Sequence, residues 1–214
     1  LEDEPLCCSD IMAKIADAAF RGGAAGIRAN TVVDINAIKA KVNLPVIGII
    51  KREYKNSECY ITPTMREVDE LIEQAKPEII AVDATARRHP DGEDGAEFIE
   101  KIKSKYPDRL LMADISTLEE GISAWKAGAD LVSTTLSGYT SYSPAIEGPD
   151  FELMKELCRN VDIPVIAEGR IWSPDDAVKA FKQGVYAIVV GGAITRPMEI
   201  TKRFVKRISS AEQA

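Results

Sequence analysis

The amino-acid sequence predicts an α/β fold built on a parallel β-sheet, and three observations carry this prediction. Seven short runs of aliphatic and β-branched residues recur along the 214-residue chain. Most of these runs are almost continuously apolar, as in residues 46–50 (Val-Ile-Gly-Ile-Ile), which is typical of strands covered on both faces. Amphipathic stretches separate the runs, and parallel strands require helical connections of this kind.

The expected strands are, in chain order, residues 25–29, 45–51, 78–84, 110–115, 131–136, 164–170 and 187–192. Helices are expected around them, over residues 9–22, 33–42, 64–75, 94–106, 117–128, 150–160, 173–184 and 196–208. Several helix starts carry a residue that caps an N-terminus with a side-chain oxygen: Ser9, Thr64, Thr117 and Ser173. Pro174 fits a first helical turn, where its missing N–H costs no hydrogen bond.

Repeated helix–strand units favour either a (β/α)8 barrel, the TIM barrel, or an open doubly wound sheet. Eight helices accompany seven strands, and the first helix begins within ten residues of Leu1. The first strand of a barrel is therefore expected to be missing from this sequence. Because no linker or change of composition divides the chain, we expect residues 1–214 to form a single (β/α)8-barrel domain that is incomplete at its N-terminus.

The charge balance excludes several classes of partner. Lysine and arginine total 27 against 34 aspartate and glutamate residues, for a formal net charge of −7. No basic run is long enough to follow a phosphate backbone, so neither nucleic acid nor an anionic membrane is an expected partner. No apolar run approaches the ~20 residues that cross a bilayer. The four cysteines lack Cys-x-x-Cys spacing, so we expect a reduced, cytoplasmic location.

The single histidine, His89, lies in a segment of turn-forming residues, 87–92, and is expected to be exposed. One histidine leaves no cluster for a transition metal, so no metal site is predicted. The chain also lacks a dinucleotide-binding fingerprint, and we expect no cofactor.

Polar residues collect where the predicted strands end. In parallel α/β folds the functional site lies at the carboxyl ends of the strands. These ends supply Arg28, Lys51, Asp83, Asp114, Thr134-Thr135, Glu168-Gly169-Arg170 and Gly191-Gly192. A single terminal charge is usually a solvated rim residue, but several at equivalent positions favour a barrel whose mouth gathers them.

Lys51 and Glu168 are the expected catalytic pair. Each follows a Pro-Val-Ile run, which places an amine and a carboxylate on opposite sides of a barrel. Burial lowers the pKa of a lysine and raises that of a glutamate, so both groups can exchange protons with a carbon acid held between them. The alternative is a structural ion pair between Lys51 and Glu168 across the barrel.

The last predicted strand leads into a glycine turn and a helix, an arrangement that suits a phosphate group. Gly191 and Gly192 let the backbone approach the anion, helix N–H groups donate to it, and Arg196 adds positive charge. Gly169 and Arg170 on the neighbouring strand are expected to face the same place, as in barrels that bind phosphate after strands seven and eight.

Seven segments carry a resemblance to a known family: residues 25–30 (AGIRAN), 48–52 (GIIKR), 60–64 (YITPT), 112–117 (MADIST), 133–140 (STTLSGYT), 165–170 (VIAEGR) and 190–201 (VGGAITRPMEIT). With them the chain closely resembles the N-acetylmannosamine-6-phosphate 2-epimerase family along essentially its whole length. The resemblance implies a phosphate-binding (β/α)8 barrel. It also implies an isomerase of bacterial sialic acid breakdown that interconverts N-acetylmannosamine 6-phosphate and N-acetylglucosamine 6-phosphate.

The resemblance further implies roles for individual residues. The family's catalytic lysine falls on Lys51 and its glutamate on Glu168, while Arg28 and Asp114 match substrate-binding positions. The phosphate site falls on Gly191, Gly192 and Arg196. Family members begin with an additional strand ending in Ser-Cys-Gln, and this sequence starts just after that motif.

Other functions stay open at this point. A phosphosugar isomerase, aldolase or decarboxylase would use the same phosphate site with different mouth chemistry, and Lys51 would then serve as a Schiff-base lysine. A non-catalytic phosphosugar sensor would keep the phosphate site without turnover. The oligomeric state is also open, with a homodimer as one candidate.

Overall fold

The computed structural model describes residues 5, 6 and 8–212, and its centre is a sheet of seven parallel strands. The order of the strands in space follows the chain, so every connection joins neighbours. The strands are β1 (Ile27–Asn30), β2 (Val46–Ile49), β3 (Ile79–Asp83), β4 (Leu110–Asp114), β5 (Leu131–Ser133), β6 (Val165–Glu168) and β7 (Ala187–Val189).

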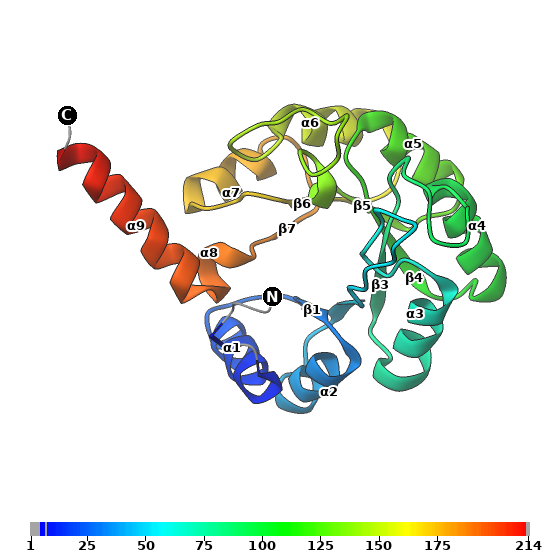
Figure 1. Cartoon of the computed structure of the whole chain (residues 1–214), viewed down its shortest axis with the longest axis horizontal. Helices are drawn as coiled ribbons and strands as arrows, with labels where there is room; N and C mark the ends of the chain where they lie inside the picture. The colour runs from blue at the N-terminus through cyan, green and yellow to red at the C-terminus, as the bar shows by residue number, and fades with distance from the viewer. Residues whose placement is uncertain (1–4, 7, 213–214) are drawn as a thin grey trace.

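Helices lie on the outside of the curved sheet (Figure 1). They are α1 (Ser9–Arg21), α2 (Val32–Lys41), α3 (Met65–Glu70), α4 (Gly95–Lys105), α5 (Leu118–Lys126), α6 (Phe151–Asn160), α7 (Pro174–Phe181), α8 (Gly192–Thr195) and α9 (Pro197–Glu212). The strands form a nearly closed (β/α)8-type barrel, which confirms the expected fold class. Strands β1 and β7 end the described strand order, and α9 extends away from the ring (Figure 1).

The expected strands all form, but some boundaries differ. Residues 134–136 were expected to continue a strand and instead make a 3-10 turn. The helix expected over 64–75 ends as a π-helical turn over Leu71–Ala75. The helix expected from residue 196 is preceded by the short helix α8, which begins at Gly192.

Three of the four expected helix caps are confirmed. Thr64, Thr117 and Ser173 each close a capping box with an acidic side chain three residues later. The prediction for Ser9 was wrong, because Ser9 is already the first helical residue and Cys8 precedes it without a side-chain cap. The Ser9 hydroxyl instead donates to Asp34 at 2.5 Å, which ties α1 to α2.

Two apolar layers hold the barrel together. The larger one lies between sheet and helices, with Ile35, Val68, Phe98, Leu111 and Met154 among its buried residues. The smaller one fills the barrel interior and consists of Ile49, Ile61, Ala81, Met112, Leu136 and Ile166. This interior plug forms the floor beneath the carboxyl ends of the strands, as in other barrels of this architecture.

One residue of the plug comes from a loop rather than a strand. The β2–α3 loop folds back so that Ile61 pairs antiparallel with Lys51, and Thr62 N donates to Ile50 O at 2.8 Å. On its other side, Asp83 N donates to Ile61 O at 2.9 Å. The loop is therefore built into the mouth between β2 and β3.

We predict that Gly95→Ala destabilises the fold, since helix α4 begins against the backbone of Ala84. A Cβ at residue 95 would lie 2.5 Å from the carbonyl carbon of Ala84, and backbone cannot yield as a flexible side chain can. The expected cost in the free energy of unfolding is about 1–3 kcal/mol. Urea denaturation of both proteins measures it.

Gly148→Ala is the matched control for this prediction. A Cβ at residue 148 meets no atom within 4 Å, so the same added methyl group should change stability by less than about 1 kcal/mol. Equal stability of the two variants would contradict the tight packing of α4 on Ala84.

Candidate active site

The carboxyl ends of the strands bring most of the predicted site residues to one face of the barrel. Arg28 lies within β1, Asp114 is the last residue of β4, and Glu168 is the last residue of β6. Lys51 follows β2 by two residues, at the point where the returning loop pairs with it. Residues far apart in the sequence thus line a common mouth.

Arg28 connects three strands across this mouth. Its guanidinium binds both carboxylate oxygens of Asp114, with Nη1 to Oδ1 at 3.0 Å and Nη2 to Oδ2 at 2.6 Å. Nη1 also donates to Glu168 Oε2 at 3.0 Å. The Asp114 side chain is fully buried, and those of Arg28 and Glu168 are 9% and 18% exposed. These three side chains form a buried cluster, called here the Arg28 cluster.

Threonine hydroxyl groups complete the hydrogen bonds of the Arg28 cluster. Thr135 Oγ1 donates to Asp114 Oδ1 at 2.7 Å and lies 2.8 Å from Ser133 Oγ. Thr134 Oγ1 donates to the backbone oxygen of Glu168 at 2.8 Å and accepts from its backbone N–H at 3.1 Å. The position of Glu168 is therefore fixed through both its backbone and its side chain.

Burial and charge pairing shift the pKa values of these groups in a way that suits proton transfer. Burial raises the pKa of Glu168 to about 7, although Arg28 acts in the opposite direction. Burial opposes the charged form of Arg28, yet Asp114 and Glu168 together raise the pKa of Arg28 above its ordinary value. Near neutral pH, Glu168 can therefore accept or donate a proton while Arg28 stays charged.

Lys51 has no carboxylate within salt-bridge distance among the described residues, so the alternative of a structural Lys51–Glu168 ion pair is wrong. Its backbone N–H donates to Asn30 Oδ1 at 2.8 Å, and its Nζ lies 5.7 Å from the centre of the Tyr60 ring. Burial and then the positive charge of Arg28 lower the pKa of Lys51. A lysine in this environment has an increased fraction of the free amine, the form that acts as a base.

Gly191, Gly192 and Arg196, for which the sequence predicts a phosphate site, lie at the two ends of the short helix α8. Gly191 precedes the first turn of α8, and Arg196 follows its last residue. A Cβ at residue 191 would meet no atom within 4 Å, whereas one at residue 192 would lie 3.2 Å from the Trp172 indole. The first N–H groups of a helix lack intrahelical acceptors and are available to an anion.

Gly169 and Arg170, predicted to bind substrate, follow β6 with left-handed backbone conformations. The Arg170 guanidinium donates to two backbone oxygens of the β5–α6 loop, those of Gly148 and Ser137, both at 2.8 Å. Its contacts thus assign Arg170 to holding this loop, and they give no support to a direct role in phosphate binding. Gly169 turns the chain between Glu168 and Arg170.

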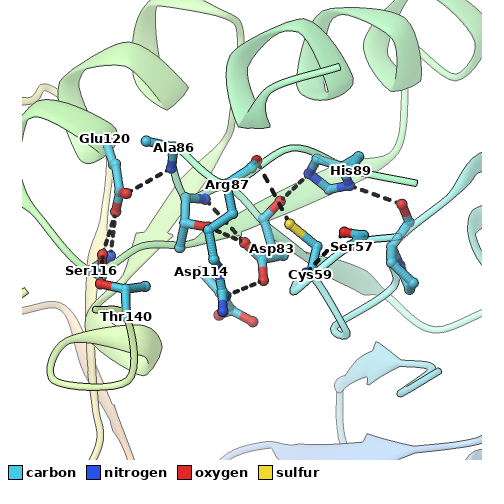
Figure 2. Close-up of polar contacts among 12 residues, drawn as sticks. Ser57, Cys59, Asp83, Ala86, Arg87, His89, Asp114, Ser116, Glu120 and Thr140 are labelled. Atoms are coloured by element: carbon cyan, nitrogen blue, oxygen red, sulfur yellow. Dashed lines mark hydrogen bonds and ion pairs between the residues drawn. The ribbon is translucent and has the colours of Figure 1, made fainter. Parts of the chain in front are cut away.

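The expectation that His89 is exposed was wrong, because tertiary contacts bury the turn that carries it. His89 is 2% exposed, and its ring nitrogens lie 2.8 Å from Pro63 O and 3.0 Å from Asp83 O. Its ring also packs on Phe98, with centroids 4.3 Å apart. Figure 2 shows His89 beside the buried Asp83.

Asp83 was expected in the mouth, but its carboxylate is occupied by its own loop. It accepts from Thr85 Oγ1 and Arg87 Nη2, both at 2.6 Å (Figure 2). Arg87 in turn lies over the Tyr60 ring at 6.0 Å. Tyr60 and Arg87 are mouth residues that strand ends alone did not reveal, since both lie in loops.

Within the described part of the chain, no group of three or more His, Cys, Asp or Glu side chains is placed to hold a metal ion. Among the same residues, no helix is long and apolar enough to cross a membrane.

Comparison with known proteins identifies close relatives. The family model described as "Putative N-acetylmannosamine-6-phosphate epimerase" matches residues 12–210. A protein from Caldanaerobacter subterraneus named "Putative N-acetylmannosamine-6-phosphate 2-epimerase" is 60% identical over 205 residues, covering 96% of this chain and 86% of the relative. A protein of the same name from Clostridium perfringens is 59% identical over 204 residues, covering 95% and 91%.

Solved structures agree with the sequence comparison. The N-acetylmannosamine-6-phosphate 2-epimerase structure from Clostridium perfringens is 58% identical and superposes with a TM-score of 0.91, covering 96% of this chain and 89% of that one. Thiamine phosphate pyrophosphorylase from Pyrococcus furiosus, at 20% identity and a TM-score of 0.60, covers 92% and 86% and shares the fold.

The raised pKa of Glu168 predicts a pH-dependent difference in stability between the wild type and Glu168→Gln. Between the ordinary glutamate value of 4.5 and about 7, the unfolded chain ionises Glu168 while the folded protein keeps it protonated. Rising pH therefore favours unfolding of the wild type relative to the variant, by up to about 3 kcal/mol. Urea denaturation of both proteins at several pH values measures this difference, and a difference independent of pH would contradict the assignment.

Proposed function

The chain belongs to the N-acetylmannosamine-6-phosphate 2-epimerase family, an isomerase family, and we propose that it interconverts N-acetylmannosamine 6-phosphate and N-acetylglucosamine 6-phosphate. The proposal rests on the combination of two titratable side chains, Lys51 and Glu168, in the mouth of the barrel. The mouth combines a lysine with a lowered pKa, free of ion pairs among the described residues, with a largely buried carboxyl group whose pKa lies near neutrality. These are the groups that a proton transfer at carbon needs.

The reaction begins with opening of the sugar ring. Carbon 2 lies beside a carbonyl group only in the open-chain form, and its proton is acidic only there. In this proposal Glu168 assists ring opening, or returns a proton on the opposite face. The position of Glu168 is fixed by Arg28 and Thr134, which suits it to hold one orientation through the cycle.

Lys51 is the proposed base that removes the proton from carbon 2. Removal leaves an enolate whose negative charge spreads to the carbonyl oxygen, and nearby cations and hydrogen-bond donors stabilise that charge. Return of a proton to the other face of carbon 2 completes the epimerisation. Only protons move, so the chemistry that we assign to these residues is acid–base chemistry.

The 6-phosphate is proposed to bind at Gly191 and Gly192, with Arg196 beside it. Support comes from the open space at Gly191 and from Arg196, whose charge contributes to lowering the pKa of Lys51. The phosphate would thus be held on the β7 side of the mouth while carbon 2 faces Lys51. Binding energy from the non-reacting phosphate then helps to position the reacting carbon.

The first test is turnover in heavy water. We expect the wild type to convert N-acetylmannosamine 6-phosphate into its epimer and to place deuterium at carbon 2, as followed by proton NMR. Lys51→Ala should lower turnover by about 10²-fold or more, because the general base is lost. Conversion without deuterium at carbon 2, or full activity of Lys51→Ala, would contradict the mechanism.

The phosphate site has its own test in Gly192→Asp. A carboxylate at residue 192 repels the 6-phosphate, so we expect KM to rise by about tenfold or more, equivalent to about 1.4 kcal/mol of binding. Gly192→Ala is the control, because it adds the same Cβ against Trp172 without the charge. Equal KM values for the two variants would contradict phosphate binding at this loop.

A further inference from the structure

We propose that Tyr60 is a further catalytic residue whose hydroxyl group donates a hydrogen bond to the carbonyl oxygen of the open-chain substrate. This inference rests on the proposed function and adds a residue that the strand-end pattern did not identify. Tyr60 lies in the β2–α3 loop, directly before Ile61, which pairs with Lys51. The loop therefore places an aromatic side chain next to the proposed base.

The Tyr60 ring lies between the apolar plug and two cationic side chains. It is half-buried and packs on the apolar plug of the barrel interior. Lys51 Nζ lies 5.7 Å from the ring centre and the Arg87 guanidinium carbon lies 6.0 Å from it. Both distances are within the range of a cation–π contact. A substrate whose carbon 2 faces Lys51 must then have its neighbouring atoms close to Tyr60.

The Tyr60 hydroxyl has no hydrogen-bond partner among residues 5, 6 and 8–212, unlike three other tyrosines. Tyr54, Tyr106 and Tyr142 each donate to a carboxylate, those of Glu67, Asp69 and Glu120. Burial raises the pKa of Tyr60, so the phenol keeps its proton at neutral pH. The mouth thus contains a protonated donor that is available to a ligand.

The backbone on both sides of Tyr60 is fixed by hydrogen bonds. Before it, Cys59 N donates to Ser57 Oγ at 3.0 Å (Figure 2). Ser57 Oγ in turn donates to Arg88 O at 2.7 Å. At Tyr60 itself, the backbone oxygen accepts from Arg52 N at 3.0 Å. After it, Ile61 is held by Lys51 and Asp83.

Such fixation is expected of a donor that stabilises a transition state. A donor already in place needs no reorganisation when charge develops on the substrate, and this is the source of most electrostatic catalysis. A loop residue held only by solvent-exposed contacts would not meet this requirement. The fixed backbone on both sides of Tyr60 therefore favours a donor that needs little reorganisation.

The neighbouring cationic groups are already committed to protein carboxylates. Arg28 is bound to Asp114 and Glu168, and Arg87 is bound to Asp83 and Thr85. Both guanidinium groups thus have carboxylate partners within the protein, whereas the Tyr60 phenol, whose ring lies 5.7 Å from Lys51 Nζ, has none among the described residues. The geometry favours Tyr60 as the group that meets the developing charge.

The proposed step balances as follows. The Lys51 amine takes the proton from carbon 2, and the electron pair of that C–H bond forms the double bond between carbons 1 and 2. The carbonyl electrons move to oxygen 1, which accepts the hydrogen bond from Tyr60. Reprotonation at carbon 2 reverses the electron flow and restores the aldehyde. Tyr60 keeps its proton throughout.

The test compares Tyr60→Phe with the wild type in the conversion of N-acetylmannosamine 6-phosphate. The variant removes only the hydroxyl and retains the ring that faces Lys51 and Arg87. We expect kcat to fall by about 10²-fold, with KM and the thermal midpoint close to wild-type values, because loss of one such donor weakens transition-state binding alone.

Tyr54→Phe is the matched control, since Tyr54 lies in the same loop and its hydroxyl binds the buried Glu67 outside the mouth. It should retain wild-type kcat. Wild-type kcat in Tyr60→Phe, a change confined to KM, or an equal loss of kcat in Tyr54→Phe would overturn the role of Tyr60. Absence of conversion by the wild type would instead overturn the proposed function.

Discussion

The structure depends above all on the buried guanidinium of Arg28, which joins β1 to β4 and β6 across the mouth. A charge in this position is costly unless it is paired, and here two carboxylates share it. Removal of Arg28 would leave Asp114 and Glu168 facing each other without compensation. The cluster therefore fixes the spacing of three strands and the ionisation of Glu168 together.

This pairing also explains why Lys51 is free. Asp114 and Glu168 point into the same mouth as Lys51, yet Arg28 takes their hydrogen bonds. The charges of the Arg28 cluster have opposing effects on the pKa of Lys51, because Arg28 lowers it while Glu168 and Asp114 raise it. Burial has the largest effect on the pKa of Lys51 and lowers it. Lys51 therefore loses its proton more readily than Arg28, whose pKa is raised.

Buried carboxylates help to hold the loops around the mouth, in addition to the apolar contacts of loop residues such as Ile61. Glu120 accepts from Ala86 N and from Ser116 N, both at 2.7 Å (Figure 2). It also accepts from the Tyr142 hydroxyl at 2.6 Å and so joins three loops. Asp83 does the same for the segment that carries Arg87. Polar anchors of this kind are directional, and they fix loop positions more narrowly than apolar contact does.

The sequence by itself determined the alternation of strands and helices, three helix caps and the residues at the strand ends. These features depend on local periodicity and on the rule that parallel strands end at one face, both of which can be read without coordinates. Only the tertiary structure decided that Arg28 rather than Lys51 pairs with Glu168, that Arg170 holds a loop, and that His89 is buried. Each of these outcomes depends on which side chains meet across long sequence separations, as Arg28 and Glu168 do over 140 residues. The strand-end pattern did not identify Tyr60 as a site residue for the same reason. The path of a loop depends on the groups that bind it, and the hydrophobic pattern of the loop itself does not show this path.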